Sequence, residues 1–246
     1  IYIGDFMLYS STENEKIKKL KKLQIKKYRD QSKQFLIETP HLIIEAFKAG
    51  YLDLLIVLEN EDFTLDVETI TVTSKVMDYL SQLKTKNKVM GVCHYKEEKP
   101  IGKKVLMLEN IQDPGNLGTI IRTSVAFNVD TLIISNDTVD IYNDKVIRAS
   151  EGMLFKLNII KTDLKEMIKK LKNNNYLIIG TDVKKGKEIK HFKSFDNFAI
   201  IMGNEGKGLT EDTKKLCDEF IYIDMSLECE SLNVAIATSI ILYELR

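Results

Sequence analysis

The chain has 246 residues, of which 44% are hydrophobic and 29% charged. This composition is typical of a globular protein with one large domain or two moderate ones. Its 36 basic and 36 acidic side chains cancel, so the molecule as a whole has no electrostatic commitment to nucleic acid, and the distribution of charge matters more than its sum.

Cysteine, histidine and hydropathy patterns exclude further classes. Three scattered histidines and three cysteines without a C-x-x-C spacing indicate a reduced protein with no metal centre. No apolar run approaches the length of a membrane span, and the first nine residues are too short and uncharged for a signal peptide. We therefore expect a cytoplasmic protein without a metal or membrane partner. Because the first methionine is Met7, residues 1–6 are expected to be upstream sequence or disordered.

Residues 1–95 predict a small α/β domain. The stretch 13–33 has Ile17, Leu20 and Leu23 at helical spacing and is the most basic part of the chain, which predicts a basic helix. A second helix is expected to begin at Pro40, and short apolar runs farther along predict strands. The charged, proline-containing segment 96–104 is the predicted linker.

From Val105 onward, apolar strands alternate with helical stretches. Such alternation predicts a mostly parallel sheet covered on both faces, with ligands binding beyond the C-terminal ends of the strands. The predicted strands cover residues 105–110, 131–135, 176–182, 198–203 and 220–225, and the predicted helices cover residues 116–128, 163–174, 209–218 and 231–246.

Three loops at predicted strand ends have unusual chemistry. In "IQDPGNLGTIIRT" a D-P-G turn precedes a helix that Asn116 could cap and on which Arg122 lies. In "IIMGNEGKGLT" the glycines resemble a phosphate loop, but Gly208 stands where Ser or Thr is required and Glu205 would repel a pyrophosphate. In "IDMSLECESLNVAIA" a last helix is expected to begin near Ser231, and it is apolar nearly all round, which predicts burial within the fold or against a partner.

Each loop alone has an ordinary structural explanation: a snorkelling arginine, a tight helix entry, a helix cap. Together and in this order they closely resemble the three signature motifs of the SpoU (TrmH-type) RNA 2′-O-ribose methyltransferases of the SPOUT superfamily. Residues 146–159 are similar to the stretch between the first two motifs, and the resemblance covers roughly residues 104–246. More weakly, residues 13–95 resemble the small RNA-binding domain, similar to certain ribosomal proteins, that many members carry in front.

The resemblance implies a fold, a cofactor and a partner. The fold is α/β: a mostly parallel sheet with a C-terminal trefoil knot over residues 105–246, preceded by the ribosomal-protein-like domain. The implied cofactor is S-adenosylmethionine, and the implied assembly is a homodimer formed partly by the last helix. The implied cofactor-binding residues are Gly203, Asn204, Gly208, Ile223, Met225, Leu232 and Asn233, and the implied catalytic residues are Asn116, Arg122, Glu205, Ser231 and Asn233.

The implied reaction is methylation of a ribose 2′-hydroxyl, in ribosomal RNA rather than transfer RNA because of the front domain. The family picture puts Arg122 at that hydroxyl. Because a guanidinium is a poor base, we expect it to clamp a phosphate and stabilise developing alkoxide, with proton removal by Arg122 or a neighbour left open. The alternatives are a tRNA methyltransferase and an inactive RNA-binding assembly protein. The intact Asn116, Arg122, Glu205 and Asn233 argue against the last alternative, while Asp224 and Leu227, where the family usually has Pro and Gly, leave it open.

Overall fold

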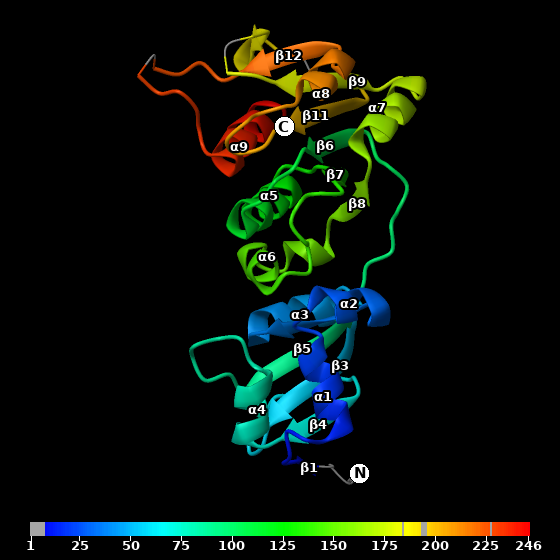
Figure 1. Cartoon of the computed structure of the whole chain (residues 1–246), viewed down its shortest axis with the longest axis vertical. Helices are drawn as coiled ribbons and strands as arrows, with labels where there is room; N and C mark the ends of the chain where they lie inside the picture. The colour runs from blue at the N-terminus through cyan, green and yellow to red at the C-terminus, as the bar shows by residue number, and fades with distance from the viewer. Residues whose placement is uncertain (1–7, 184, 193–195, 227) are drawn as a thin grey trace. The chain divides into compact units, whose positions relative to one another are not determined.

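The computed structural model describes residues 8–183, 185–192, 196–226 and 228–246. The chain divides into two compact units, Ile1–Glu97 and Glu98–Arg246 (Figure 1). The expectations for residues 1–6 and for Leu227 lie outside the described residues.

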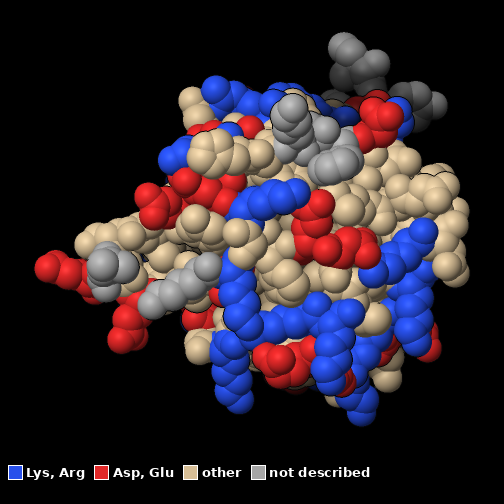
Figure 2. All heavy atoms as spheres, turned by 90° about the horizontal axis from the view of Figure 1, so that it is seen from above, with Lys and Arg blue, Asp and Glu red and all other residues tan. Residues whose placement is uncertain are grey.

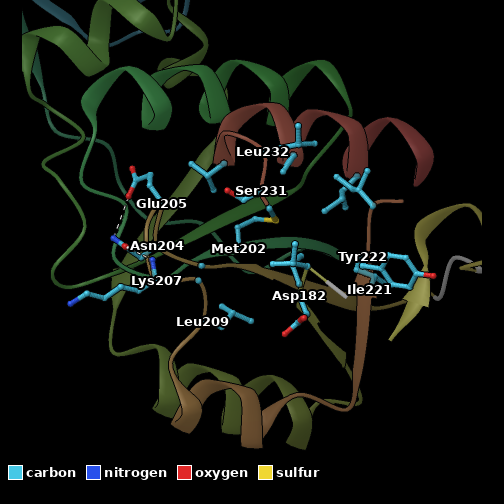
Figure 3. A pocket seen from close by; sticks show the side chains of 18 of the residues that line it. Asp182, Met202, Asn204, Glu205, Lys207, Leu209, Ile221, Tyr222, Ser231 and Leu232 are labelled. Carbon is cyan, nitrogen blue, oxygen red and sulfur yellow. Dashed lines mark hydrogen bonds between the residues drawn. The ribbon is translucent and has the colours of Figure 1, made fainter. Parts of the chain in front are cut away.

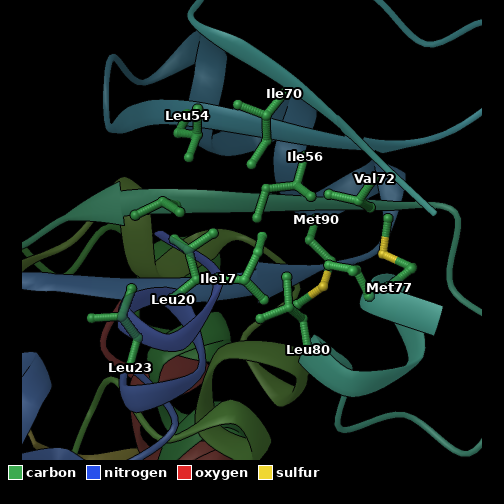
Figure 4. Packing of buried hydrophobic residues seen from close by; sticks show 12 residues of the cluster. Ile17, Leu20, Leu23, Leu54, Ile56, Ile70, Val72, Met77, Leu80 and Met90 are labelled. Atoms are coloured by element: carbon green, nitrogen blue, oxygen red, sulfur yellow. The ribbon is translucent and has the colours of Figure 1, made fainter. Parts of the chain in front are cut away.

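The first unit is a five-stranded mixed sheet with helices on it. The strand order is β1-β4-β3-β5-β2, with β5 antiparallel to both of its neighbours. Its elements are β1 (Leu8–Tyr9), α1 (Glu15–Lys22), α2 (Lys26–Ser32), β2 (Gln34–Glu38), α3 (Pro40–Lys48), β3 (Leu52–Leu58), β4 (Thr69–Val72), α4 (Ser74–Leu80) and β5 (Val89–His94). The apolar face of α1 packs with α4 onto the sheet, and Ile17, Leu20 and Leu23 are buried as their spacing predicts (Figure 4).

The predicted basic helix is wrong in one respect, because it is two helices. The apolar positions that bury α1 end at Leu23, and the chain turns there before α2 begins at Lys26. Arg29, inside the basic stretch, is buried and donates from Nη1 to the carbonyl oxygen of Leu23 at 2.9 Å. The guanidinium thus satisfies a carbonyl that the end of α1 leaves without a helical partner.

The second unit is a seven-stranded sheet in the order β10-β12-β9-β11-β6-β7-β8, and every neighbouring pair is parallel. This confirms the predicted α/β fold with a mostly parallel sheet. Its elements are β6 (Lys104–Leu108), α5 (Pro114–Ala126), β7 (Thr131–Ser135), α6 (Asp144–Ala149), η1 (Met153–Phe155), β8 (Asn158–Thr162), α7 (Leu164–Asn173), β9 (Leu177–Thr181), β10 (Lys187–Glu188), η2 (Ile189–His191), β11 (Phe198–Met202), α8 (Glu211–Leu216), β12 (Glu219–Tyr222) and α9 (Val234–Glu244).

Helices cover both faces of this sheet. α7 and α8 lie together on one face and pack against a cluster of buried side chains from β6, β7, β9 and β11. On the other face α5 lies beside α9 (Figure 3). No helix within the described ranges is long and apolar enough to cross a membrane.

Candidate active site

Two of the three motif loops leave the sheet side by side. β11 pairs with β6 so that Met202 lies opposite Leu108, at the last residue of each strand. The backbone N–H of Glu109 continues the pairing to the Met202 carbonyl at 2.9 Å, and Asn204 Nδ2 donates to the carbonyl of Asn110 at 2.8 Å. The loops after β6 and β11 are therefore fastened to each other at the C-terminal edge of the sheet, where ligands of parallel sheets bind.

The start of α5 corrects one expectation. Asp113, not Asn116, caps the helix: its Oδ1 accepts from the N–H of Asn116 at 2.7 Å, and Pro114 takes the first helical position. Asn116 lies inside the first turn of the helix. Its side-chain amide is consequently available for contacts outside the helix.

Glu205 ties the second loop to the first. Its carboxylate accepts from the backbone N–H groups of Gln112 at 3.2 Å and Asp113 at 3.1 Å, and from Asn116 Nδ2 at 3.3 Å. Partial burial raises the pKa of Glu205, but hydrogen bonds from its own N–H and from these three donors outweigh that effect and hold the pKa below its ordinary value. Glu205 is therefore ionised and has a structural role: its carboxylate accepts hydrogen bonds from the N–H groups of the first loop.

The third loop joins this network through Asn233. α9 begins at Val234, not near Ser231, and its cap is Asn233, whose Oδ1 accepts from the N–H of Ala235 at 2.9 Å. Asn233 Nδ2 donates to Asn116 Oδ1 at 2.9 Å. A continuous chain of hydrogen bonds, Glu205–Asn116–Asn233, thus links all three motif loops.

Arg122 lies on α5, two turns beyond the start of the helix. Its side chain is exposed, like that of Thr119 one turn earlier on the same face. No hydrogen bond or ion pair engages the Arg122 guanidinium among the residues that the structure describes. The guanidinium can therefore bind an anion from solution, in addition to any packing role of its aliphatic stem.

A cavity of about 400 Å³ opens beside these loops (Figure 3). This is a volume typical of a small-molecule site, about 300–1,000 Å³. Its walls include six of the seven predicted cofactor residues and two of the predicted catalytic ones: Gly203, Asn204, Gly208, Ile223, Met225, Leu232, Glu205 and Ser231. Asn116, Arg122 and Asn233 are not among the lining residues.

The sequence reasoning missed the part of the wall that follows β9. Thr181, Asp182 and Val183 line the cavity there, because β9 lies between β11 and β12. Thr181 is fixed by a hydrogen bond from its Oγ1 to the carbonyl of Ile201 at 2.9 Å. A signal was present, since the segment ends a predicted parallel strand, but only the strand order shows that this end borders the site. Met202, Lys214 and Tyr222 are further lining residues that were not predicted.

In the glycine loop, residues 203–209, two stretches of backbone approach each other closely. A Cβ on Gly203 would lie 2.2 Å from the carbonyl carbon of Gly208, and Gly208 itself has a φ of +66° that favours glycine. The N–H groups of Asn204 and Gly208 pair with each other's carbonyls, at 3.0 and 2.9 Å. Asn204 Oδ1 accepts from the N–H groups of Gly206 and Lys207, at 3.0 and 3.1 Å.

These bonds decide what the loop can hold. A phosphate cradle presents several unpaired backbone N–H groups to the anion, whereas here those of residues 204, 206, 207 and 208 are already bonded within the loop. The residues therefore fit a nucleoside-like ligand without phosphate, such as S-adenosylmethionine, and do not fit a nucleotide di- or triphosphate.

Comparison with known proteins agrees with this chemistry. Residues 103–243 match the model of the SpoU rRNA methylase family. The chain belongs to the SpoU rRNA methylase family. The match confirms the predicted recognition, the predicted activity of an RNA ribose 2′-O-methyltransferase and the predicted cofactor, S-adenosylmethionine. Residues 14–91 match a second model, the MRM3-like substrate binding domain.

Relatives of this SpoU methylase extend over both units. A 23S rRNA (guanosine(2553)-2′-O)-methyltransferase of Bacillus subtilis is 34% identical, over 96% of this chain and 98% of its own. A solved RNA 2′-O ribose methyltransferase is 26% identical, with a TM-score of 0.81 over 97% of this chain and 98% of its own. An rRNA methyltransferase from Sinorhizobium meliloti, solved with S-adenosylmethionine bound, has the same fold, with 24% identity and a TM-score of 0.87 over 99% and 98% of the two chains.

Proposed function

We propose that this SpoU methylase transfers a methyl group to a ribose 2′-hydroxyl of large-subunit ribosomal RNA. The observation that carries the proposal is a cavity lined by the second and third motif loops, to which Glu205 and Asn233 tie the first loop by hydrogen bonds to Asn116. The N–H groups of residues 204, 206, 207 and 208 beside this cavity are bonded within their own loop and not offered to a phosphate. The choice of ribosomal over transfer RNA is supported by the Bacillus subtilis 23S rRNA enzyme, which matches this chain along nearly its whole length.

The residues in and beside the cavity have two roles, to bind the cofactor and to position the target ribose. Gly203, Ile223 and Leu232 would hold the cofactor, with the glycine allowing close approach of the backbone. S-adenosylmethionine supplies an electrophilic methyl group carried on a sulfonium. Asn116 and Asn233, bonded to each other at 2.9 Å, fix the first and third loops and position the target ribose at the mouth of the site.

Arg122 is the residue that meets the RNA. Its free guanidinium presents a fork of N–H donors suited to a phosphate beside the target ribose. The same positive charge stabilises the alkoxide that develops as the 2′-hydroxyl loses its proton. Because the guanidinium is a poor base, the proton goes to another acceptor, which leaves Arg122 an electrostatic role.

Two further features belong to this proposal. We infer that residues 8–97 form the ribosomal-protein-like RNA-binding domain, supported by the match of residues 14–91 to a substrate binding domain. We also infer the trefoil knot implied by the resemblance, which is supported by the fold that this chain shares with a solved RNA 2′-O ribose methyltransferase. An experimental structure that traces residues 220–246 through or around the loop after β11 tests the knot directly.

We also propose a homodimer through α9. This helix buries Val234, Ala235, Thr238, Ile241 and Leu242 within its own unit. Ile236 and Tyr243, seven residues apart on one side, stay 53% and 49% exposed. Such an apolar face on a helix that is otherwise buried suits a second copy of the chain. Light scattering tests this: Ile236→Asp should give a monomer, while Ile25→Asp, at an isoleucine 55% exposed in the other unit, should leave the dimer intact.

The deciding experiment is transfer of labelled methyl from S-adenosylmethionine to unmodified 23S rRNA and, separately, to tRNA. We expect label at one ribose of the 23S rRNA, protected from alkaline cleavage there, and a loss of about 10²–10³-fold in rate for Arg122→Ala, as for removal of one stabiliser of a developing oxyanion. Label on tRNA alone would transfer the proposal to the tRNA alternative. No transfer to either RNA and no cofactor binding by calorimetry would favour the inactive RNA-binding protein.

A further inference from the structure

A second cavity, of about 560 Å³, lies within the first unit, far along the chain from the motif loops. α1 and α2 form one wall, and β2, β3 and β5 contribute to the other. Its floor is apolar and is formed by Leu20 of α1, Leu23 at the end of that helix, Leu54 of β3 and Val92 of β5. Leu20, Leu23 and Leu54 are labelled in Figure 4. This floor is continuous with the hydrophobic core of the unit, so the cavity has a fixed shape.

The rim of this cavity is basic along α1. Lys16, Lys19 and Lys22 follow one another at three-residue spacing and all line it. Lys16 is paired with Glu68 at 2.8 Å, whereas Lys19 and Lys22 form no ion pair among the described residues. The stretch 16–33 holds nine Lys and Arg residues and one acidic residue, in a chain whose net charge is zero. The rim is therefore a local concentration of positive charge, in which Glu68 pairs with Lys16 while Lys19 and Lys22 keep no acidic partner among the described residues.

An aromatic ring and an uncommitted amide stand at the same place. Tyr28 of α2 lines the cavity, and the ammonium groups of Lys22 and Lys27 lie 5.5 and 6.0 Å from its ring centroid. Gln31, one turn later, presents a side-chain amide that has no partner within the described part of the chain. Asp53, by contrast, is engaged on both oxygens, by Gln34 at 3.1 Å and His94 at 2.7 Å.

We propose that this cavity receives an unpaired base of the RNA substrate, with Tyr28 as the stacking surface, Gln31 reading the edge of the base, and Lys19 and Lys22 meeting the flanking phosphates. An apolar slot with one aromatic ring and a basic rim is the combination by which proteins hold splayed or single-stranded nucleotides. A purely apolar ligand would leave the lysines and the amide unused. The inference deepens the proposed function and rests on it for the identity of the RNA.

The test uses the full-length protein and an unmodified 23S rRNA transcript. Equilibrium binding is measured by filter retention across a salt series, and kcat and KM for the RNA are measured by methyl transfer. Tyr28→Ala should weaken binding and raise KM about tenfold with kcat unchanged, as expected for loss of one base–aromatic stack. Lys19→Glu with Lys22→Glu should lower the slope of log affinity against log salt by about 0.7 for each lost phosphate contact.

Matched controls come from the same unit. Tyr79→Ala removes an exposed tyrosine that also has a lysine, Lys21, near its ring but lines neither cavity described above. Lys84→Glu with Lys86→Glu makes the same charge change at two exposed lysines that follow α4 and do not line the cavity. Both controls should bind RNA with the wild-type affinity and salt slope. Thermal unfolding shows whether each variant is folded. If Tyr28→Ala is unstable, the salt slope of the variant with Lys19→Glu and Lys22→Glu tests the proposal instead.

Three results would overturn the proposal. The first is an equal effect of the cavity and control variants on RNA affinity. The second is a loss of kcat with unchanged KM. The third is normal action on naked RNA but impaired action on ribosomal particles, which would make the cavity a site for a ribosomal protein. Because the binding arm does not depend on methyl transfer, failure of the proposed activity is recognised separately, by wild-type protein that binds the RNA yet transfers no methyl.

Discussion

Each of the two units carries a cavity, and the two cavities differ in whether their polar side chains are bonded to other residues. In the second unit the polar groups around the site are committed to one another: Glu205, Asn116 and Asn233 bond across three loops, and the glycine loop uses its own N–H groups. In the first unit the side chains of Lys19, Lys22 and Gln31 form no hydrogen bond or ion pair among the described residues. A cofactor site needs fixed geometry, whereas a surface for a long polyanion gains from charges that remain unpaired until it binds.

The units share one device, a buried glutamate that holds a loop. Glu38 of the first unit accepts from Ser81 Oγ at 2.6 Å and the N–H of Gln82 at 2.8 Å. Glu109 of the second accepts from the N–H of Thr210 at 2.9 Å and from its hydroxyl at 2.8 Å. Only Glu109 acts beside a cavity, since Thr210 directly follows the glycine loop and caps α8. Loss of the glutamate should therefore affect cofactor binding in the second unit and stability alone in the first.

The largest effect is expected at the cofactor loop. Gly203→Ala places a Cβ 2.2 Å from the backbone of Gly208, so the loop must shift. Overpacking of a rigid site costs about 1–3 kcal/mol, and we expect cofactor binding to weaken about 10- to 100-fold. Gly206→Ala is the control in the same loop, because its Cβ would come no nearer than 3.8 Å to another residue. Calorimetry with S-adenosylmethionine measures both. Equal affinities for the two variants would contradict the close approach that defines this loop.

Comparison of the two buried glutamates comes next. Glu109→Ala leaves the N–H and hydroxyl of Thr210 and the hydroxyl of Thr213 without their acceptor, which should cost about 2–3 kcal/mol of unfolding free energy and also weaken cofactor binding. Glu38→Ala should cost a similar amount of stability with unchanged cofactor affinity. Denaturant unfolding measures the unfolding free energy of both variants, and calorimetry measures their affinity for S-adenosylmethionine. A loss of cofactor affinity in Glu38→Ala would show that the units are energetically coupled.

Glu205 makes a smaller, pH-dependent contribution. Its pKa is held below its ordinary value of 4.5 in the folded protein, so its stabilising effect is fully present above that value and is lost as pH falls through the lowered folded pKa. The difference in unfolding free energy between wild type and Glu205→Gln should thus be constant from pH 7 to 5 and shrink below pH 4.5. Glu230→Gln removes a carboxylate from the same cavity without touching the loop N–H groups and serves as control. If the difference in unfolding free energy between wild type and Glu205→Gln grows as pH falls, the pKa of Glu205 is not lowered in the folded protein.

The fold and most of the cavity wall could be predicted from sequence because they depend on pattern. Alternating apolar runs and helices require the parallel sheet, and the motif loops follow from strand ends. The short edge strands β8 and β10 were not predicted, because Asn158–Thr162 has only two apolar residues and Lys187–Glu188 is a two-residue pairing.

What failed depends on contacts between distant segments. Asn116 and Ser231 are both plausible caps by residue type, yet Asp113 and Asn233 take those positions. Residue type alone does not separate these candidates, and the partners of the Asn116 side chain, Glu205 and Asn233, lie far away in sequence. Asp182 was missed for the same reason, because only the position of β9 beside β11 brings it to the cavity.

The smallest expected effect concerns opposite charges on the two units. The segment after β12 extends away from its sheet and carries the exposed acidic residues Asp224, Glu228 and Glu230 (Figure 1). Viewed from above, Asp and Glu side chains gather on a projection of the surface (Figure 2). A polyanion that enters the site should be repelled at this segment and attracted at the basic rim of the first unit.

Single-charge variants should therefore act with opposite signs. Asp224→Asn is expected to strengthen RNA binding about twofold at 50 mM salt, and Lys19→Gln to weaken it by a similar factor, with both effects fading as salt rises because exposed charges are screened. Filter binding of the 23S rRNA transcript at two salt concentrations measures each variant. If Asp224→Asn weakens RNA binding instead, the carboxylate that replaces the family's usual proline contributes to RNA recognition, and the acidic segment is part of the substrate surface rather than a boundary to it.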